Sequence, residues 1–260
     1  MLLSLFLALW FAQERIVFQP PKNFPADDCK FAKRIEYHAS DGQRLVGFLI
    51  EPDIAPSALL ICFHGNADLA AWQLDWGREV SRRTGHSVFL AEYRGYSGLE
   101  GKPTYASTAL DADAAYRVGA ERSSAGARSI SLFGHSLGSA VAVELAARVS
   151  ARRLVLQSPF TSARAMGRLV IGRPLLMLWD RLSRVHFDTP KIVSSLDVPV
   201  SVVHGSRDRI VPLRMGEAVF SAARVKGRFL ILENAGHNDI PAVGGTQYWE
   251  WLSEALKADI

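Results

Sequence analysis

The chain has 260 residues, of which 48% are hydrophobic, a size and composition typical of one α/β domain with a buried sheet. Thirty lysines and arginines against 26 acidic residues leave a net charge of +4. The sequence contains no long basic tract, which argues against a nucleic-acid-binding protein. The two cysteines, Cys29 and Cys62, match no metal-binding spacing, and Cys62 lies in an apolar run where a buried thiol is expected.

The N-terminus is apolar from Met1 to Ala12 apart from Ser4, a stretch too short to span a bilayer as a straight helix. It lacks the basic residues and the cleavage site of a secretory leader, which disfavours a cleaved signal peptide. We therefore expect residues 1–18 either to dip into a membrane as an anchor or to cover a patch on the protein's own surface. The first alternative predicts a membrane-associated protein that is otherwise cytoplasmic.

After a proline-rich connector over residues 19–25, strand and helix patterns alternate along the chain. Two segments, 34–38 and 45–50, flank the turn Ser40-Asp41-Gly42 and predict a hairpin. The later apolar runs are continuous, as in parallel strands buried on both faces, and cover 58–63, 87–93, 129–133, 154–157, 198–203 and 229–232. Helical patterns lie between them at about 69–84, 107–121, 139–147, 215–223 and 246–258. This alternation predicts right-handed βαβ units in a single domain over residues 19–260.

The motif Gly134-His135-Ser136-Leu137-Gly138 lies between one of these strands and the helical pattern that follows it. A G-x-S-x-G turn lifts a serine hydroxyl above a sheet, and its two glycines give the tight turn room. We predict Ser136 as a nucleophile. The competing interpretation is a glycine-rich loop with an ordinary serine, so partners at the carboxyl ends of the other strands decide between the two.

The predicted strand 58–63 ends in His64-Gly65-Asn66-Ala67. A turn of this kind can aim a backbone N–H at the oxyanion of an acyl-transfer reaction, and the residue after the nucleophile supplies a second N–H. We predict Asn66 and Leu137 as this oxyanion pair and expect only a structural role for His64.

The strand 198–203 is followed by Asp208, in a loop that Pro212 stiffens before the next helix. A carboxylate at this position can orient an imidazole, and it fits the acid in the chain order serine, acid, histidine. The alternative is a surface carboxylate paired with a neighbouring arginine. One strand earlier the chain offers only Gln157-Ser158-Pro159, without a carboxylate, which leaves Asp208 as the predicted acid.

His237 follows the last predicted strand in Glu233-Asn234-Ala235-Gly236-His237-Asn238-Asp239, where the base of this chain order belongs. A histidine with a pKa near 6.5 can accept the serine proton at neutral pH and return it to the leaving group. Other histidines fit the order or the strand-end position less well: His38, His86, His135, His186 and His204. We expect Asp239 to serve the loop itself.

Together, Gly134-His135-Ser136-Leu137-Gly138, His64-Gly65-Asn66, Asp208 and Ala235-Gly236-His237 resemble the α/β-hydrolase superfamily. Further segments resemble its small-lid bud-emergence-type hydrolases and their protein-depalmitoylase relatives: Tyr93-Arg94-Gly95-Tyr96-Ser97-Gly98 with Gly101-Lys102-Pro103-Thr104, Ser158-Pro159-Phe160-Thr161-Ser162, and Phe187-Asp188 before Lys191-Ile192. The resemblance covers about residues 16–256. It implies an eight-stranded, mostly parallel sheet with helices on both faces and a short helical lid, a serine nucleophile and no cofactor.

One departure from the family pattern concerns a loop at the pocket. The family's Y-R-G-Y-G-x-S-x-G is replaced by Tyr-Arg-Gly-Tyr-Ser-Gly-Leu-Glu-Gly over residues 93–101, with one glycine displaced. We therefore do not transfer the family's substrate preference to this chain. Gly95 is expected to turn the chain, the two tyrosines to pack, and Arg94 to have no catalytic role.

The expected lid, residues 161–187, is apolar and basic. Its five arginines stand against one acid, Asp180: Arg164, Arg168, Arg173, Arg181 and Arg184. Such a segment either rests on anionic lipid or admits acyl chains, or it is a helix with solvated arginines and its apolar side on the core. Gly172 and Pro174 predict that it divides into two pieces.

The leading hypothesis is a serine hydrolase that cleaves carboxylic esters or acyl thioesters through an acyl-enzyme. Its substrate would be a small carboxylic ester, a lysolipid or monoacylglycerol, or a protein acyl thioester. The alternative is a non-catalytic, membrane-associated binding protein on the same fold, because a fold does not determine a function. A non-catalytic protein has no physical need to hold a serine, an acid and a histidine in this order. No nucleic-acid partner, metal or cofactor is predicted, and the oligomeric state stays open.

Overall fold

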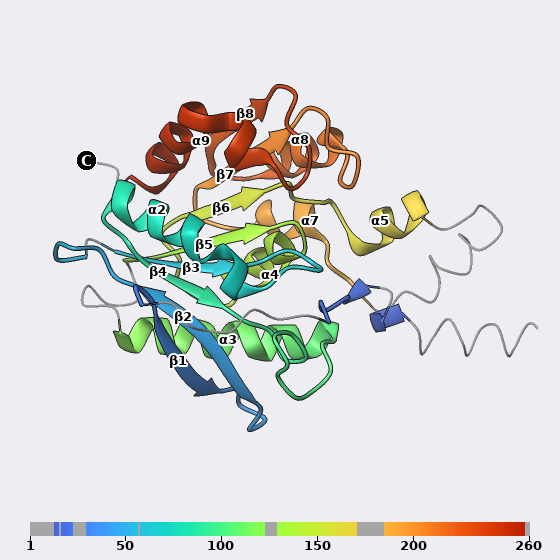
Figure 1. The fold of residues 1–260 in the computed structure, drawn as a ribbon. Coiled ribbons are helices and arrows are strands. Elements are labelled where there is room, and N and C mark those ends of the chain that lie inside the picture. The colour runs from blue at the N-terminus through green and yellow to red at the C-terminus, as the bar shows by residue number, and fades with distance from the viewer. Residues whose placement is uncertain are drawn as a thin grey trace, which may run out of the picture.

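A computed structural model of the chain describes residues 13–15, 17–22, 30–56, 58–122, 129–170 and 185–257. Within these residues, eight strands form one sheet in the order β1-β2-β4-β3-β5-β6-β7-β8 (Figure 1). The hairpin strands β1 and β2 are antiparallel, and β2 runs antiparallel to β4. All other neighbours are parallel. The expected mostly parallel, eight-stranded sheet is therefore confirmed.

The strands are β1 (Lys33–His38), β2 (Arg44–Ile50), β3 (Leu59–Phe63), β4 (Ser87–Ala91), β5 (Ile130–His135), β6 (Leu154–Gln157), β7 (Val200–Gly205) and β8 (Lys226–Leu232). The helices are the 3-10 helix η1 (Ala70–Gln73) and the α-helices α2 (Leu74–Thr84), α3 (Tyr105–Arg122), α4 (Leu137–Ala146), α5 (Ala163–Val170), α7 (Thr189–Val193), α8 (Leu213–Ala222) and α9 (Ile240–Leu256).

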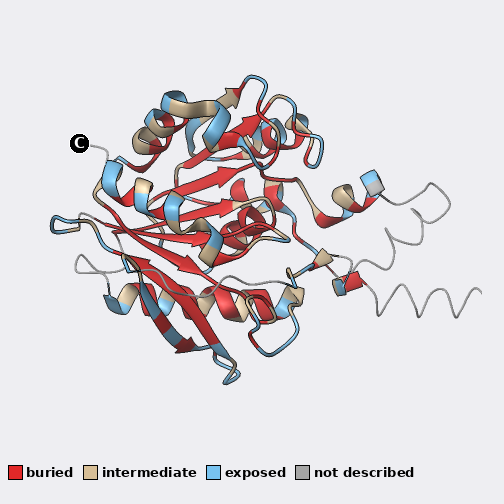
Figure 2. Ribbon diagram, in the orientation of Figure 1, coloured by how far each residue is buried: buried red, intermediate tan, exposed pale blue. Residues whose placement is uncertain are grey.

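Helices cover both faces of the sheet, and the inner strands β2 to β7 are almost entirely buried, whereas the edge strands β1 and β8 are largely exposed or half-buried (Figure 2). In β3, Leu59, Ile61 and Phe63 belong to the core that the sheet forms with α3, α4 and α8. Leu60 and Cys62, which point the other way, belong to the core formed with α2 and α9. Burial on both faces explains why these strands read as continuous apolar runs in the sequence.

Most elements begin or end within a few residues of the expected positions, and three differences are described here. β5 runs two residues further than predicted, through Gly134 and His135, so the strand leads directly into the serine turn. α9 begins at Ile240, six residues earlier than predicted, because a separate helical turn precedes a kink at Gly245, whose φ is +47°. The five-residue helix α7 was not predicted; Pro190 lies in its first turn, where a missing N–H costs nothing.

The predictions for the N-terminus and for the lid concern residues that lie mostly outside the described part of the chain. Residues 1–12, the apolar N-terminal stretch, and residues 171–184, the middle of the expected lid, are not described, and neither is Cys29. Phe18, at the end of the 1–18 segment, is 3% exposed and packs into the core, so that end lies on the protein itself. No helix in the described part of the chain is both long enough and apolar enough to cross a membrane.

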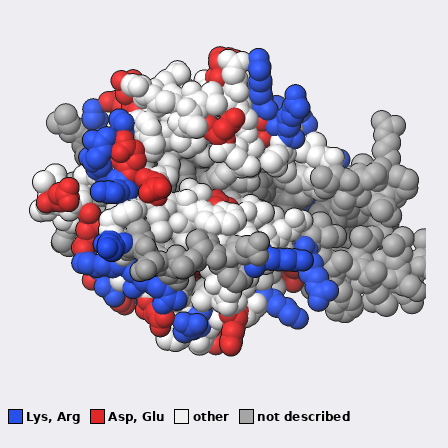
Figure 3. All heavy atoms as spheres, viewed as in Figure 1, with Lys and Arg blue, Asp and Glu red and all other residues white. Residues whose placement is uncertain are grey.

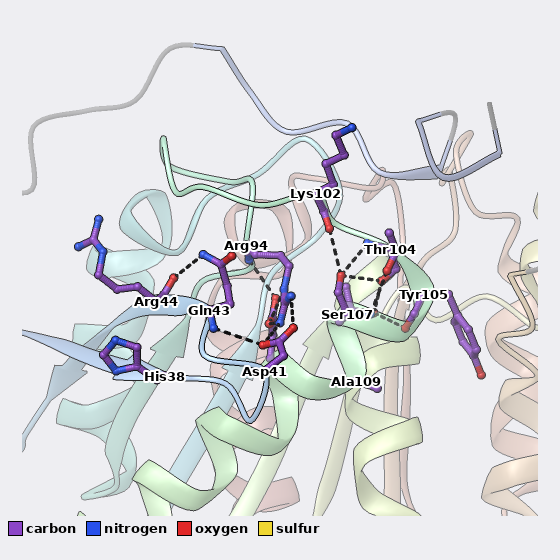
Figure 4. A network of polar contacts seen from close by, with 12 residues as sticks. His38, Asp41, Gln43, Arg44, Arg94, Lys102, Thr104, Tyr105, Ser107 and Ala109 are labelled. Atoms are coloured by element: carbon purple, nitrogen blue, oxygen red, sulfur yellow. Dashed lines mark hydrogen bonds and ion pairs between the residues drawn. The ribbon is translucent and has the colours of Figure 1, made fainter. Parts of the chain in front are cut away.

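A buried arginine ties the hairpin turn to the sheet and to α3. The Arg94 guanidinium donates to Asp41 in the β1–β2 turn at 2.6 Å and to Asp111 in α3 at 2.7 Å (Figure 4). The Arg94 backbone N–H also donates to Asp111. Both flanking tyrosines, Tyr93 and Tyr96, are buried. The structural roles expected for this segment are thus observed.

Candidate active site

Ser136 lies at a strained turn between β5 and α4. Its φ is 53° and its ψ is −114°, a backbone conformation that residues with a side chain rarely adopt. A Cβ at Gly134 would clash with the backbone of Gly138, and a Cβ at Gly138 would clash with the carbonyl of Phe63 in β3. Only glycine fits at both positions. The structure thus has the strand, the tight turn and the helix that were predicted around Ser136.

Asp208 and His237 are in direct contact, although they come from different loops. Nδ1 of His237 lies 2.7 Å from Oδ2 of Asp208, and both side chains are buried. The other carboxylate oxygen accepts the backbone N–H groups of Ile210 and Val211 at 2.9 and 2.8 Å. These bonds fix the carboxylate within its loop, and the carboxylate in turn orients the imidazole.

The environment of Asp208 keeps its carboxyl ionised. Burial alone would raise its pKa, but hydrogen bonds with His204 and His237 lower it well below its usual range. Since an ionised carboxylate only accepts hydrogen bonds, Nδ1 of His237 must carry the proton. In the neutral imidazole, Nε2 of His237 then has a free lone pair, as a general base requires.

His204, one of the rival histidines, supports the same carboxylate. Its Nε2 lies 2.8 Å from the carbonyl of Val211 and 3.4 Å from Oδ2 of Asp208. The ring is completely buried and does not line the cavity described below. His204 therefore acts on the position of Asp208 and has no access to a substrate.

Ser136 and His237 line the same cavity, which has a volume of about 470 Å³. Aromatic and polar side chains both contribute to its wall, among them Trp72, Trp76, Phe133, Asn66, Asp68, Gln73, Gln157 and Asn238. In the part of the chain described here, no hydrogen bond joins the Ser136 hydroxyl to His237. Such contacts are often long in unliganded enzymes and shorten when substrate binds.

The loop after β3 brings Asn66 to this cavity, as predicted. Leu137 is the first residue of α4, and an N–H at that position has no acceptor within its own helix. Among the described residues, none accepts a hydrogen bond from the backbone N–H of Asn66 or of Leu137. Asn66 lines the cavity, whereas Leu137 is buried and is not among the residues that line it.

A buried ion pair lies under this loop. His64 Nε2 is 2.6 Å from Oε1 of Glu92, and both side chains are almost completely buried. Burial lowers the pKa of His64, but Glu92, together with Asp68 and the Gly65 carbonyl, outweighs burial and raises it. Glu92 also accepts the N–H of Ala70 and the hydroxyl of Ser97. The expected structural role of His64 is observed, whereas the role of Glu92 was not anticipated from the sequence.

His135 lines the cavity beside His237 and was also not anticipated there. The two ring centroids are 5.0 Å apart, and Nε2 of His135 lies 3.2 Å from the His237 carbonyl. Burial, together with the neighbouring His237, lowers the pKa of His135 to about 3. His135 is therefore neutral at physiological pH and too weak a base to take the serine proton.

Several wall residues carried no recognisable signal in the sequence. The rings of Trp76 and Phe133 contact each other at a tilt of 38°, with centroids 4.6 Å apart. Trp76 Nε1 donates to the Tyr248 hydroxyl, which donates to Gln157 Oε1. The aromatic wall thus comes from η1, α2 and β5, whose apolar patterns predict a core and not a cavity.

Asp239 accepts the Gly236 N–H at 2.6 Å, the loop role expected for it.

The molecular surface carries both positive and negative side chains. On the face shown in Figure 3, described lysines, arginines and acids gather towards the edges, and the centre is largely uncharged. The described cavity wall includes one acidic side chain, Asp68, whose pKa burial raises.

Comparison with known proteins gives relatives across most of the chain. No protein-family model matches. The uncharacterized protein Rv2307c of Mycobacterium tuberculosis is 33% identical over 242 residues, which cover 91% of this chain and 84% of that protein. Human alpha/beta hydrolase domain-containing protein 17B is 27% identical over 224 residues, which cover 85% of this chain and 74% of that protein.

Solved structures match the fold. The Pyrococcus furiosus esterase Pf2001 superimposes with a TM-score of 0.69 at 19% identity and covers 92% of this chain and 96% of that one. The esterase domain of a Rhodothermus marinus protein superimposes with a TM-score of 0.62 at 19% identity, over 86% of this chain and 95% of that one. At these identities the likeness shows a common α/β-hydrolase fold.

Proposed function

Because this chain belongs to the α/β-hydrolase superfamily, as its shared fold and relatives show, we propose that it is a serine hydrolase that cleaves carboxylic esters or acyl thioesters. The observation that carries the proposal is the 2.7 Å contact between Asp208 and His237, at a cavity that Ser136 also lines. This arrangement of an acid, a base and a strained serine turn has a direct chemical use.

In the proposed reaction, Ser136 Oγ attacks the acyl carbonyl carbon while Nε2 of His237 takes the hydroxyl proton. The carbonyl oxygen becomes an oxyanion that accepts the N–H groups of Asn66 and Leu137. The intermediate collapses, the alcohol or thiol leaves with the proton from His237, and an acyl group stays on Ser136. A water molecule, deprotonated by His237, then attacks this ester and releases the acid.

The cavity suits an acyl group and leaves the choice of substrate class open. Its volume of about 470 Å³ falls within the range of small-molecule sites, and Trp72, Trp76 and Phe133 offer apolar surface to a hydrocarbon chain. Small carboxylic esters, lysolipids or monoacylglycerols, and protein acyl thioesters all carry such a group. A short lid over 161–187, of the small-lid depalmitoylase-like kind, and membrane attachment through residues 1–18 belong to the same proposal.

A fluorophosphonate ester tests the nucleophile directly. We expect the intact mass of the parent protein to increase by one adduct and that of Ser136→Ala to stay unchanged. Ser158→Ala is the matched control, because Ser158 also follows a strand and has a φ of 47°, yet it is fully buried away from the cavity. Loss of labelling in the control, or an adduct on Ser136→Ala, would contradict the assignment. No adduct on the folded parent would favour the non-catalytic binding protein.

A further inference from the structure

The side chain of Asn66 is held by two segments that are distant in sequence. Its Nδ2 donates to the Val17 carbonyl at 2.6 Å, and its Oδ1 accepts the Gln19 backbone N–H at 2.8 Å and the Tyr96 hydroxyl at 2.9 Å. Two residues of the N-terminal segment 17–22, Val17 and Gln19, thus contact the residue whose backbone N–H is the proposed oxyanion donor. In Figure 1 this segment, drawn in blue, lies at the end of the sheet to which the arrows of the parallel strands β3 to β8 point.

Both sides of this contact are firmly anchored. Phe18, between the two residues that bond Asn66, is 3% exposed and packs into the core. Tyr96 is completely buried, and its ring meets the ring of His64 edge-on, with centroids 5.4 Å apart. Asn66 is therefore held between two rigid groups and not between mobile side chains.

The backbone beside Asn66 needs such support. Ala67 has a φ of 53°, a left-handed conformation that is strained for a residue with a side chain. Strain of this kind persists only where surrounding contacts impose it. On one side of Ala67 the loop is held by the Asn66 side chain, and on the other by the bond from the Ala70 N–H to Glu92.

We propose that the Asn66 side chain is a positioning residue, which sets the direction of its own backbone N–H in the oxyanion hole and makes residues 17–19 part of the active site. The inference rests on the proposed hydrolase function. An amide side chain is required because one end donates to Val17 while the other accepts from Gln19 and Tyr96. A shift of the N-terminal segment would then be transmitted to the reaction rate through Asn66.

The first test compares Asn66→Ala with the parent on p-nitrophenyl butyrate, a neutral short ester. The variant keeps the backbone N–H and loses all three side-chain bonds. We expect kcat per active site to fall roughly 10- to 100-fold, because a displaced oxyanion donor stabilises the transition state poorly, while KM changes little. Active sites are counted by fluorophosphonate labelling, so a partly unfolded preparation does not imitate the effect. An unchanged kcat would overturn the proposal.

The second test removes single bonds. Gln19→Pro deletes the N–H that donates to Asn66, and the residue precedes Pro20, a context that favours the extended backbone which proline also adopts. Gln19→Ala retains this N–H, so we expect the larger loss of kcat from Gln19→Pro. Tyr96→Phe removes the third bond without any change to the backbone and should also lower kcat. Equal losses in the two Gln19 variants, with parental kcat in Tyr96→Phe, would overturn the proposal.

A double variant separates positioning from general damage to the fold. If the N-terminal segment acts through Asn66, Gln19→Pro adds no further loss of kcat to Asn66→Ala. Losses that multiply would show independent effects and contradict the coupling. Failure of this inference can be distinguished from failure of the proposed function. The proposed function fails if the parent does not hydrolyse the ester, or if Ser136→Ala hydrolyses it as fast as the parent.

Discussion

Nδ1 of His237 and Oδ2 of Asp208 lie 2.7 Å apart, although 29 residues separate them in the chain. Oδ1 of this carboxylate accepts the N–H groups of Ile210 and Val211, and its Oδ2 also lies near Nε2 of His204. A carboxylate fixed in this way permits only the tautomer of His237 that leaves Nε2 free.

Asp208→Asn tests the importance of that tautomer. An asparagine keeps an oxygen for the two backbone N–H groups, but its NH2 group can force Nδ1 of His237 to accept and Nε2 to carry the proton. We expect kcat for ester hydrolysis to fall by about 10⁴-fold with the fold retained. Asp239→Asn, in the loop that holds His237, is the control and should keep nearly parental kcat. The opposite ranking of the two variants would show that the acid has been misidentified.

His135 makes the stability of the protein depend on pH in a defined direction. Its pKa of about 3 in the folded protein lies below the value of about 6.5 in an unfolded chain. Between these pH values unfolding takes up a proton, so the free energy of unfolding falls as pH falls below about 6.5, and the contribution of His135 is complete above it.

We expect His135→Gln, whose amide can still donate to the His237 carbonyl, to reduce this dependence. Between pH 4 and 6 the slope of unfolding free energy against pH should be smaller than the parental slope by about 1.4 kcal/mol per pH unit, the value for one proton. Urea unfolding at several pH values measures it. The other titrating groups are present in both proteins and contribute to both slopes. Identical slopes would show that His135 titrates normally.

The parts of the site that could be predicted depend on local sequence. The turn at Ser136 is encoded by two glycines, of which Gly138 approaches Phe63 of β3 and Gly134 approaches Gly138, and Asp208 and His237 each lie in the loop after a strand. Their meeting at one edge follows from the parallel sheet, whose strands end on the same side.

The parts that could not be predicted depend on the order of strands and on long-range packing. Glu92 reaches His64 because β4 lies beside β3, and nothing in the Glu92 segment itself indicates an acceptor for a histidine 28 residues earlier. The contact from Val17 to Asn66 spans 49 residues and requires the folded core that buries Phe18. The early start of α9 was missed because two glycines, Gly244 and Gly245, interrupt its apolar pattern.

The segment Tyr93–Gly98 resembles a pocket loop of the hydrolase family, but its residues do not line the cavity around Ser136, and Arg94 has the structural position expected for it. Its side chain is 8% exposed and bonds Asp111, whose side chain is 1% exposed, as well as the more accessible Asp41. A charge this deeply buried is tolerated only when it is paired, so removing one partner leaves the other uncompensated.

We expect Arg94→Leu to lower the free energy of unfolding by about 3–5 kcal/mol, measured by urea unfolding at pH 7, because Asp111 would stay buried without its counter-charge. The double variant Arg94→Leu/Asp111→Leu should recover much of this loss, since it buries no unpaired charge. Arg82→Ala is the control: Arg82 pairs with Glu79 but its side chain is 63% exposed, and such pairs contribute about 1 kcal/mol or less. If Arg94→Leu costs no more than Arg82→Ala, the arginine does not hold the hairpin turn, β4 and α3 together.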